Sequence, residues 1–212
     1  MMHRRMFAAG LALLIALPIV PARASAELES GARSFVESLA KQAVDSLADH
    51  KVSRPDRIVR FRRLFNDSFA VEVIGRWILG RHWRTATDAE QAEYLRLFED
   101  LMVVSYVDRF AEYAGEALKV HRAVTENEST VTIFSEIVRP NGGPPVRVDW
   151  RVGRNKDAVY KIVDVVVEGA SMSNTMRSDF TSVINQKSGQ VSGLIEVLRE
   201  KTAALKQEAE RK

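Results

Sequence analysis

Histidine is the first residue type to examine for chemistry, because it binds metals and transfers protons near neutral pH. The sequence has four histidines, His3, His50, His82 and His121. They fall on separate segments, and no two have the spacing of metal ligands on one helix. The patterns H-E-x-x-H, G-x-S-x-G and G-x-x-x-x-G-K-[ST] are absent, and the chain has no cysteine. We therefore expect no metal, no cofactor and no thiol chemistry.

Asp164 is the carboxylate with the best case for catalysis. It lies between Val163 and Val165. Burial among apolar side chains raises the pKa of a carboxylate, which makes it a better general base. An ion pair with Arg147 or Arg151 on the preceding predicted strand explains the same residue structurally. The sequence favours the structural interpretation and leaves the enzymatic one open.

The richest apolar pattern lies on a predicted helix that begins with the capping box Thr87-Asp88-Ala89-Glu90. Two apolar stripes run along this helix at helical spacing, so it must contact neighbours on two sides. It is either a central core helix or one wall of a cavity. The first stripe comprises Leu95, Phe98, Met102, Tyr106, Phe110 and Tyr113, and the second comprises Tyr94, Leu97, Leu101 and Val104.

Four runs rich in valine, isoleucine and threonine follow, and they predict strands at about 119–126, 130–139, 145–153 and 158–168. Short turn sequences separate these runs, which predicts an antiparallel meander. In the third run, Val146, Val148, Trp150 and Val152 alternate with charged residues, so one face should meet the interior.

Helical character extends from Glu27 to about Ala117 and returns after Gly169, with Ser171 as the expected N-cap of the next helix. Helices, then a sheet, then helices predict an α+β fold. The length after residue 26 suits one domain, 27–212. Its charged end, 199–212, is expected to be a solvated helix or a helix that binds a partner.

Residues 1–26 predict a cleaved secretory signal peptide, because a basic start precedes an apolar run, Met6–Val20, and small residues. The run is short for a membrane span and contains Pro18. Cleavage removes Arg4, Arg5 and Arg23, which leaves 28 basic residues against 28 acidic ones. A neutral chain is a poor partner for nucleic acid. Export without disulfides indicates the periplasm of a Gram-negative bacterium.

Three spaced motifs occur in order along the chain: L-G-R-x-W-R at 79–84, D-V-x-V-E-G-x-S at 164–171 and R-S-x-F at 177–180. With these motifs the chain resembles the MlaC or toluene-tolerance family of periplasmic phospholipid-binding proteins. His82 and Ala170 stand where tyrosine and valine are common in that family. The resemblance covers nearly all of the chain after the signal.

The resemblance implies a four-stranded antiparallel sheet wrapped by helices, in a fold similar to nuclear-transport-factor-2-like and cystatin-like domains. It implies an apolar pocket for acyl chains between the sheet and the helices. The first helix stripe, the apolar face of the third run and the valines of the fourth run supply the expected pocket walls. These lipid-binding candidates are Leu95, Phe98, Met102, Tyr106, Phe110, Tyr113, Val146, Val148, Trp150, Val163, Val165 and Val167.

The implied role is that of a carrier without enzymatic activity, which helps to maintain the lipid asymmetry of the outer membrane. The carrier would shuttle phospholipid across the periplasm between an outer-membrane lipoprotein and porin complex and an inner-membrane ATP-driven transporter. It would touch membranes only transiently.

Three alternatives stay open. The cargo could be a hopanoid, since relatives of this family are associated with hopanoid metabolism. The protein could be an enzyme of the same fold that uses Asp164 as its base. It could also be an adaptor without a ligand, in which case the apolar helix is ordinary core and the interior is filled.

Overall fold

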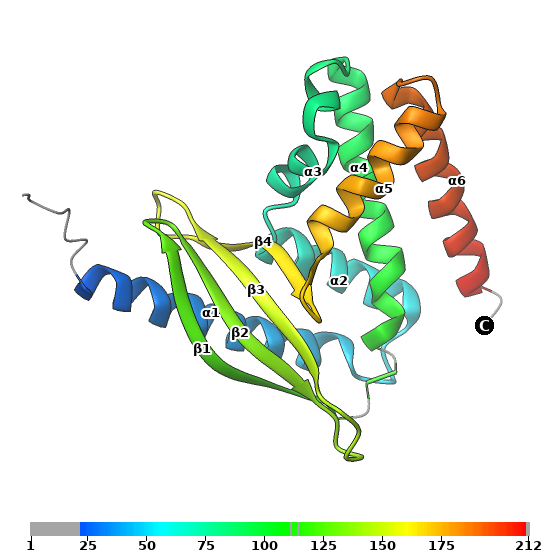
Figure 1. Cartoon of the computed structure of the whole chain (residues 1–212). Helices are drawn as coiled ribbons and strands as arrows, with labels where there is room; N and C mark the ends of the chain where they lie inside the picture. The colour runs from blue at the N-terminus through cyan, green and yellow to red at the C-terminus, as the bar shows by residue number, and fades with distance from the viewer. Residues whose placement is uncertain (1–21, 111, 114, 211–212) are drawn as a thin grey trace, which may run out of the picture.

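The structure is a computed structural model that describes residues 22–110, 112–113 and 115–210. Most of the predicted signal segment, residues 1–21, lies outside the described residues. The order of elements, helices then sheet then helices, confirms the predicted α+β class (Figure 1). In the described part the α-helices are α1 (Ala22–Leu47), α2 (Arg54–Ser68), α3 (Val71–Leu79), α4 (Asp88–Tyr106), α5 (Met172–Gln186) and α6 (Val191–Glu210), and the 3-10 helices are η1 (Gly80–Arg84) and η2 (Val107–Phe110).

The sheet is an antiparallel meander, as predicted, with the strand order β1-β2-β3-β4-β5. The expected count of four strands is wrong, because the described chain adds a fifth strand of two residues. That strand forms where Glu168 and Gly169, with φ of 49° and 85°, turn the chain back along β4. The strands are β1 (Ala117–Asn127), β2 (Thr130–Val138), β3 (Val146–Arg154), β4 (Tyr160–Val167) and β5 (Ala170–Ser171).

Helix α1 runs across one face of the sheet (Figure 1). Its buried residues recur every three or four positions, so they lie on one side of the helix and meet the apolar face of the strands. We call this apolar core the sheet cluster. Its buried members are Leu28, Ala32, Val36 and Leu39 of α1 and Val131, Ile133, Val152 and Ile162 of the strands.

Helix α4 is the centre of a second apolar core, which we call the helical cluster. It packs against α6 on one side and against α2 and α3 on the other, as its two apolar stripes predict. Tyr94 and Phe98 are almost completely buried, and the hydroxyl of Tyr94 donates a hydrogen bond of 2.9 Å to the carbonyl of Gly75. The buried members are Phe65, Ile74, Ile78, Leu79, Tyr94, Leu97, Phe98, Leu101, Met102, Phe180, Ile184, Val191, Leu194, Ile195 and Leu198.

The charged end of the chain belongs to α6, which packs along α4 (Figure 1). The guanidinium of Arg199 donates two hydrogen bonds to Glu93, of 2.8 and 2.7 Å, and Lys206 lies 3.6 Å from Asp100. The helix is therefore part of the domain up to at least Lys206. In the described part of the chain, each helix is too short or too polar to span a bilayer.

The two clusters are separate cores, and half-buried Phe69 packs against both of them. Phe69 follows α2 directly and adopts an extended conformation, with φ of −108° and ψ of 146°. The next residue, Ala70, donates its N–H to the carbonyl of Ile162 in β4 at 2.9 Å. This short linker is therefore where the helical half of the molecule meets the sheet.

The capping box at the start of α4 gives a direct test of the fold. The Thr87 hydroxyl accepts the N–H of Glu90, and the Glu90 carboxylate accepts the N–H of Thr87. Thr87→Ala removes the capping oxygen and should lower the free energy of unfolding by about 1 kcal/mol. Urea denaturation measures the change. Thr87→Ser keeps the oxygen and should stay close to the wild type; an equal loss in both variants would contradict the capping role.

Candidate functional site

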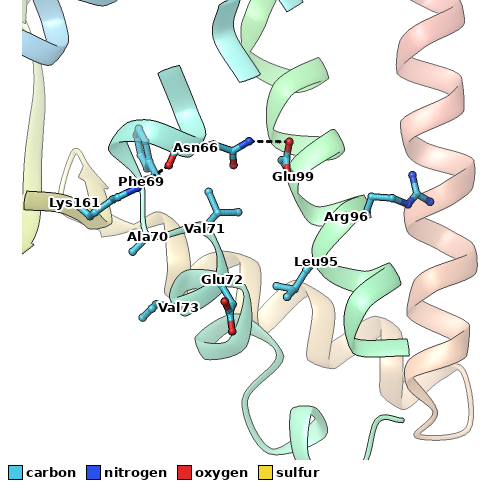
Figure 2. Close-up of a pocket in the computed structure, with 10 residues that line it drawn as sticks. All are labelled: Asn66, Phe69, Ala70, Val71, Glu72, Val73, Leu95, Arg96, Glu99 and Lys161. Atoms are coloured by element: carbon cyan, nitrogen blue, oxygen red, sulfur yellow. Dashed lines mark hydrogen bonds between the residues drawn. The ribbon is translucent and has the colours of Figure 1, made fainter. Parts of the chain in front are cut away.

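An open pocket of about 570 Å³ lies where the end of α2, the start of α3, α4 and β4 come together (Figure 2). This volume falls within the range of roughly 300–1,000 Å³ that is usual for small-molecule sites. Its residues come from three separate stretches of the sequence: the α2–α3 junction, α4 and β4. They are Asn66, Phe69, Ala70, Val71, Glu72, Val73, Leu95, Arg96, Glu99 and Lys161.

The linker between α2 and α3 shapes the pocket. Helix α2 ends at Ser68, and two non-helical residues, extended Phe69 and then Ala70 with φ of −81° and ψ of 62°, precede the start of α3 at Val71. Over this stretch Phe69 forms an isolated parallel bridge with Ile162, so the linker lies along β4. The bridge holds the phenyl ring of Phe69 and the side chain of Val71 at the junction of the two clusters.

The floor of the pocket is apolar. Phe69, Val71 and Leu95 line it and pack against the helical cluster, and Phe69 also packs against the sheet cluster. An apolar chain that entered here would therefore lie close to both the helical cluster and the sheet cluster. Such contact is favourable by about 25 cal/mol for each Å² of apolar surface removed from water.

The rim of the pocket is polar, and its side chains are held by hydrogen bonds and by ion pairs with neighbouring residues. Lys161 donates a hydrogen bond of 2.7 Å to the carbonyl of Asn66, whose side-chain amide donates one of 3.1 Å to Glu99 (Figure 2). Arg62 donates to Glu99 and to Asp100, both at 2.6 Å. A rim of this kind can meet a polar headgroup while the floor holds an apolar chain.

Arg62, next to the rim, holds the carboxylates of Glu99 and Asp100 in ion pairs. Burial lowers the pKa of Arg62, but its hydrogen bonds and attraction to Glu99 and Asp100 outweigh burial, so the pKa is raised above its ordinary value. Arg96 and Lys206 also lie within 4 Å of Asp100. The carboxylates are thus committed to ion pairs, which does not fit a catalytic acid and base.

Metal binding has no structural support in the described residues, where no group of three or more histidine, aspartate or glutamate side chains could hold an ion. His82 is 8% exposed in η1. Burial and the nearby charge of Arg81 lower its pKa.

The predicted wall residues of α4 lie in different environments. Leu95 lines the pocket, while Phe98 and Met102 are buried in the helical cluster and Tyr106 packs against it. The prediction that one helical stripe continues to Tyr113 is wrong, because α4 ends at Tyr106 and the chain continues as the 3-10 helix η2. Phe110 lies in η2 with its ring 5.6 Å from that of Phe61, and Tyr113 follows in a turn, where its hydroxyl donates to the carbonyl of Glu116 at 2.9 Å.

The predicted wall residues of the strands do not line this pocket. Val148 is buried, and Trp150 and Val165 pack against the sheet cluster. The indole N–H of Trp150 donates a hydrogen bond of 3.1 Å to the hydroxyl of Ser135. Contact of these residues with a lipid stays a prediction, as it does for the half-buried positions Val146, Val163 and Val167.

Sequence reasoning missed the residues that form the pocket floor and rim outside α4. The break between α2 and α3 contains neither proline nor glycine, so residues 66–73 read as part of a continuous helical region. The available signal was Phe69, a large aromatic residue directly after the polar Asn66-Asp67-Ser68. This signal becomes meaningful only once β4 is known to lie beside it.

Asp164 is 7% exposed and is held by hydroxyl and backbone donors. It accepts hydrogen bonds from Ser171 Oγ at 2.6 Å, from Ser173 Oγ at 2.7 Å and from Ser173 N–H at 3.1 Å. Among the described residues no direct ion pair joins Asp164 to Arg147 or Arg151. The Arg151 guanidinium binds Glu126 at 3.0 and 2.6 Å, although attraction to Asp164 on the facing strand also helps to raise its pKa. Asp164 therefore ties the start of α5 to β4.

Comparison with known proteins agrees with the resemblance seen in the sequence. The model of the family described as MlaC protein matches residues 37–200, and the chain belongs to this family. A similar solved structure is that of a phospholipid-binding protein from Ralstonia solanacearum in complex with a phospholipid. The two chains share 21% identity, and the TM-score is 0.74 over 82% of this chain and 98% of that one. At this identity the likeness establishes a shared fold.

The anchoring role of Asp164 can be tested by unfolding. Asp164→Ala removes the acceptor of both serine hydroxyls and of a buried N–H, and it should lower the free energy of unfolding by about 3 kcal/mol. Asp157→Ala, in the exposed turn between β3 and β4, is the control and should change it by less than about 0.5 kcal/mol. Equal, small losses in the two variants would show that Asp164 does not anchor α5.

Proposed function

We propose that this chain is a phospholipid carrier of the periplasm, which holds acyl chains at the junction of the helical cluster and the sheet cluster. The observation that carries the proposal is the pocket with an apolar floor at that junction, in a chain of the MlaC family. The phospholipid in the similar Ralstonia solanacearum structure supports the same class of ligand.

Acyl chains would enter beside Phe69 and Leu95 and extend between the two clusters. Leu95 lines the pocket, and Phe98 and Met102 lie on the same helix one and two turns further along. On the sheet side, Trp150 and Val165 border the sheet cluster that Phe69 also contacts. The two cores would separate at this junction to lengthen the pocket, while each keeps its own packing.

The headgroup would stay at the rim beside Lys161, which donates to the carbonyl of Asn66 and not to a carboxylate, so that its charge can also meet a phosphate.

The energetics of acyl-chain transfer suit a carrier. Moving a sixteen-carbon chain out of water is worth roughly 13 kcal/mol, at about 0.8 kcal/mol per methylene. Because a bilayer and a pocket both remove the chain from water, transfer between them can be nearly neutral. Direction would then come from partners that distinguish the loaded protein from the empty one.

The wider role follows the same proposal. The carrier would be exported by its signal segment and would exchange phospholipid with an outer-membrane lipoprotein and porin complex and with an inner-membrane ATP-driven transporter. An enzymatic role is not supported by the site, because Asp164 already serves Ser171 and Ser173, and the pocket carboxylate Glu99 is paired with Arg62.

Native mass spectrometry of the mature protein, purified without detergent, tests the proposal. We expect a bound species that is identified as phospholipid after denaturation. A hopanoid in its place would contradict the phospholipid assignment. Protein that is free of lipid and takes up none from vesicles would overturn the carrier role and favour an adaptor.

A variant with a blocked pocket links binding to this site. Val71→Trp adds an indole to the pocket floor and should reduce lipid occupancy at least about tenfold, since a lost contact of 1.4 kcal/mol already has that effect. The control is Val59→Trp on α2, at a side chain that is 67% exposed and outside the pocket. Circular dichroism checks that both variants fold. Equal occupancy in the two variants would place the lipid elsewhere.

A further inference from the structure

Two of the three sequence motifs meet on one face of the molecule. L-G-R-x-W-R forms the end of α3 and η1, and R-S-x-F lies on α5. They share a shallow surface pocket of about 510 Å³ that is separate from the floor of the first pocket. We call its lining the basic aromatic face. It consists of Val73, Arg76, Trp77, Gly80, Arg81, Trp83, Arg84 and Arg177.

Arginines and indoles are interleaved on this face. The guanidinium of Arg177 lies 4.7 Å from the ring centre of Trp77, and that of Arg76 lies 5.1 Å from the ring of Trp83. Gly80 permits this arrangement: its φ is +58°, and a Cβ there would come within 2.9 Å of the Arg177 guanidinium. The two motifs therefore fit each other physically, since the glycine of one makes room for the arginine of the other.

The face carries uncompensated positive charge. Arg76 pairs with Glu72 at 3.5 Å, but within the described residues Arg81, Arg84 and Arg177 form no ion pair with a carboxylate. The chain after residue 26 has equal numbers of basic and acidic residues. The positive charge is thus a local feature of this face and not a property of the whole chain.

The same face exposes apolar surface. Val73 is 61% exposed and Trp77 is 54% exposed, and these two apolar side chains lie together, one turn apart on the outer side of α3. Indole rings favour the boundary between headgroups and acyl chains, and arginines favour anionic headgroups. Val73 also lines the first pocket, so the face adjoins the mouth of that pocket.

From these observations we infer that the basic aromatic face docks on the surface of an anionic lipid bilayer, with Trp77 and Val73 in the headgroup region. Docking in this orientation brings the mouth of the pocket to the membrane, next to the lipid that is to be exchanged. The purpose of docking rests on the proposed function, whereas docking itself can be measured without it. An acidic surface on a protein partner is the competing occupant, but it would not require an exposed indole and valine.

Vesicle sedimentation of the mature protein tests the inference. The probes are vesicles of phosphatidylcholine alone and vesicles in which phosphatidylglycerol replaces part of it. We expect binding to the anionic vesicles only, and we expect added salt to weaken it. Each arginine near such a surface contributes about fivefold to binding, so Arg81→Gln with Arg84→Gln should lose about 25-fold. Both side chains are exposed, so the fold should tolerate the changes.

The control is Arg63→Gln with Arg139→Gln, which removes the same charge from exposed positions outside both pockets. It should bind like the wild type. Trp77→Ser should weaken binding without reducing its dependence on salt. Equal losses in both double variants, or no preference for anionic vesicles, would overturn the inference and favour an acidic protein partner. Lipid bound to the purified double variant, measured by native mass spectrometry, separates a failure of docking from a failure of the carrier role.

Discussion

The helical cluster contacts the sheet at Phe69 and Ala70, in the linker between α2 and α3, and the rest of the architecture depends on this contact. One backbone hydrogen bond joins Ala70 to Ile162, and one aromatic side chain packs against both cores. Elsewhere Asp164 ties α5 to the end of β4 through Ser171 and Ser173. The helical cluster and the sheet cluster, which includes α1, are otherwise separate apolar cores. A protein built in this way can admit an apolar chain without unfolding either core.

Paired and unpaired charges lie on different parts of the surface. At the rim of the first pocket Glu99 pairs with neighbouring Arg62, which also binds Asp100, and the lining has two acidic and two basic side chains, Glu72, Glu99, Arg96 and Lys161. Uncompensated charge is instead found on the basic aromatic face, on the outer side of α3 and η1. Val73 belongs to both pockets and joins the two features. The apolar site and the charged surface beside it therefore suit a ligand with a long apolar part and an anionic head.

The sequence predicts the elements well where local chemistry determines them. The Thr87 capping box, the Ser171 cap and the turns between valine-rich runs all appear at the expected places, because each depends on residues within a few positions. The short strand β5 was missed because its two residues pair only after Glu168 and Gly169 turn the chain. Local patterns contain little information about such a contact.

The site is harder to predict than the fold. Helical periodicity marks Phe98 and Met102 as buried, but it cannot tell a core residue from one that lines a cavity. The pocket depends on the extended linker at Phe69 and on Lys161, which lie 92 positions apart and meet through the packing of α2 on β4. Only Leu95 could be identified from the pattern alone among the residues that line it.

Photo-crosslinking is the most direct test of the central claim that acyl chains lie at the junction of the two clusters. A phospholipid with a diazirine near the end of one acyl chain would be loaded into the mature protein, irradiated, and mapped by peptide mass spectrometry. The account predicts crosslinks to the linker around Phe69 and Val71 and to the Leu95 segment of α4. Crosslinks confined to the solvent-facing side of β1 and β2, with none in these segments, would contradict it.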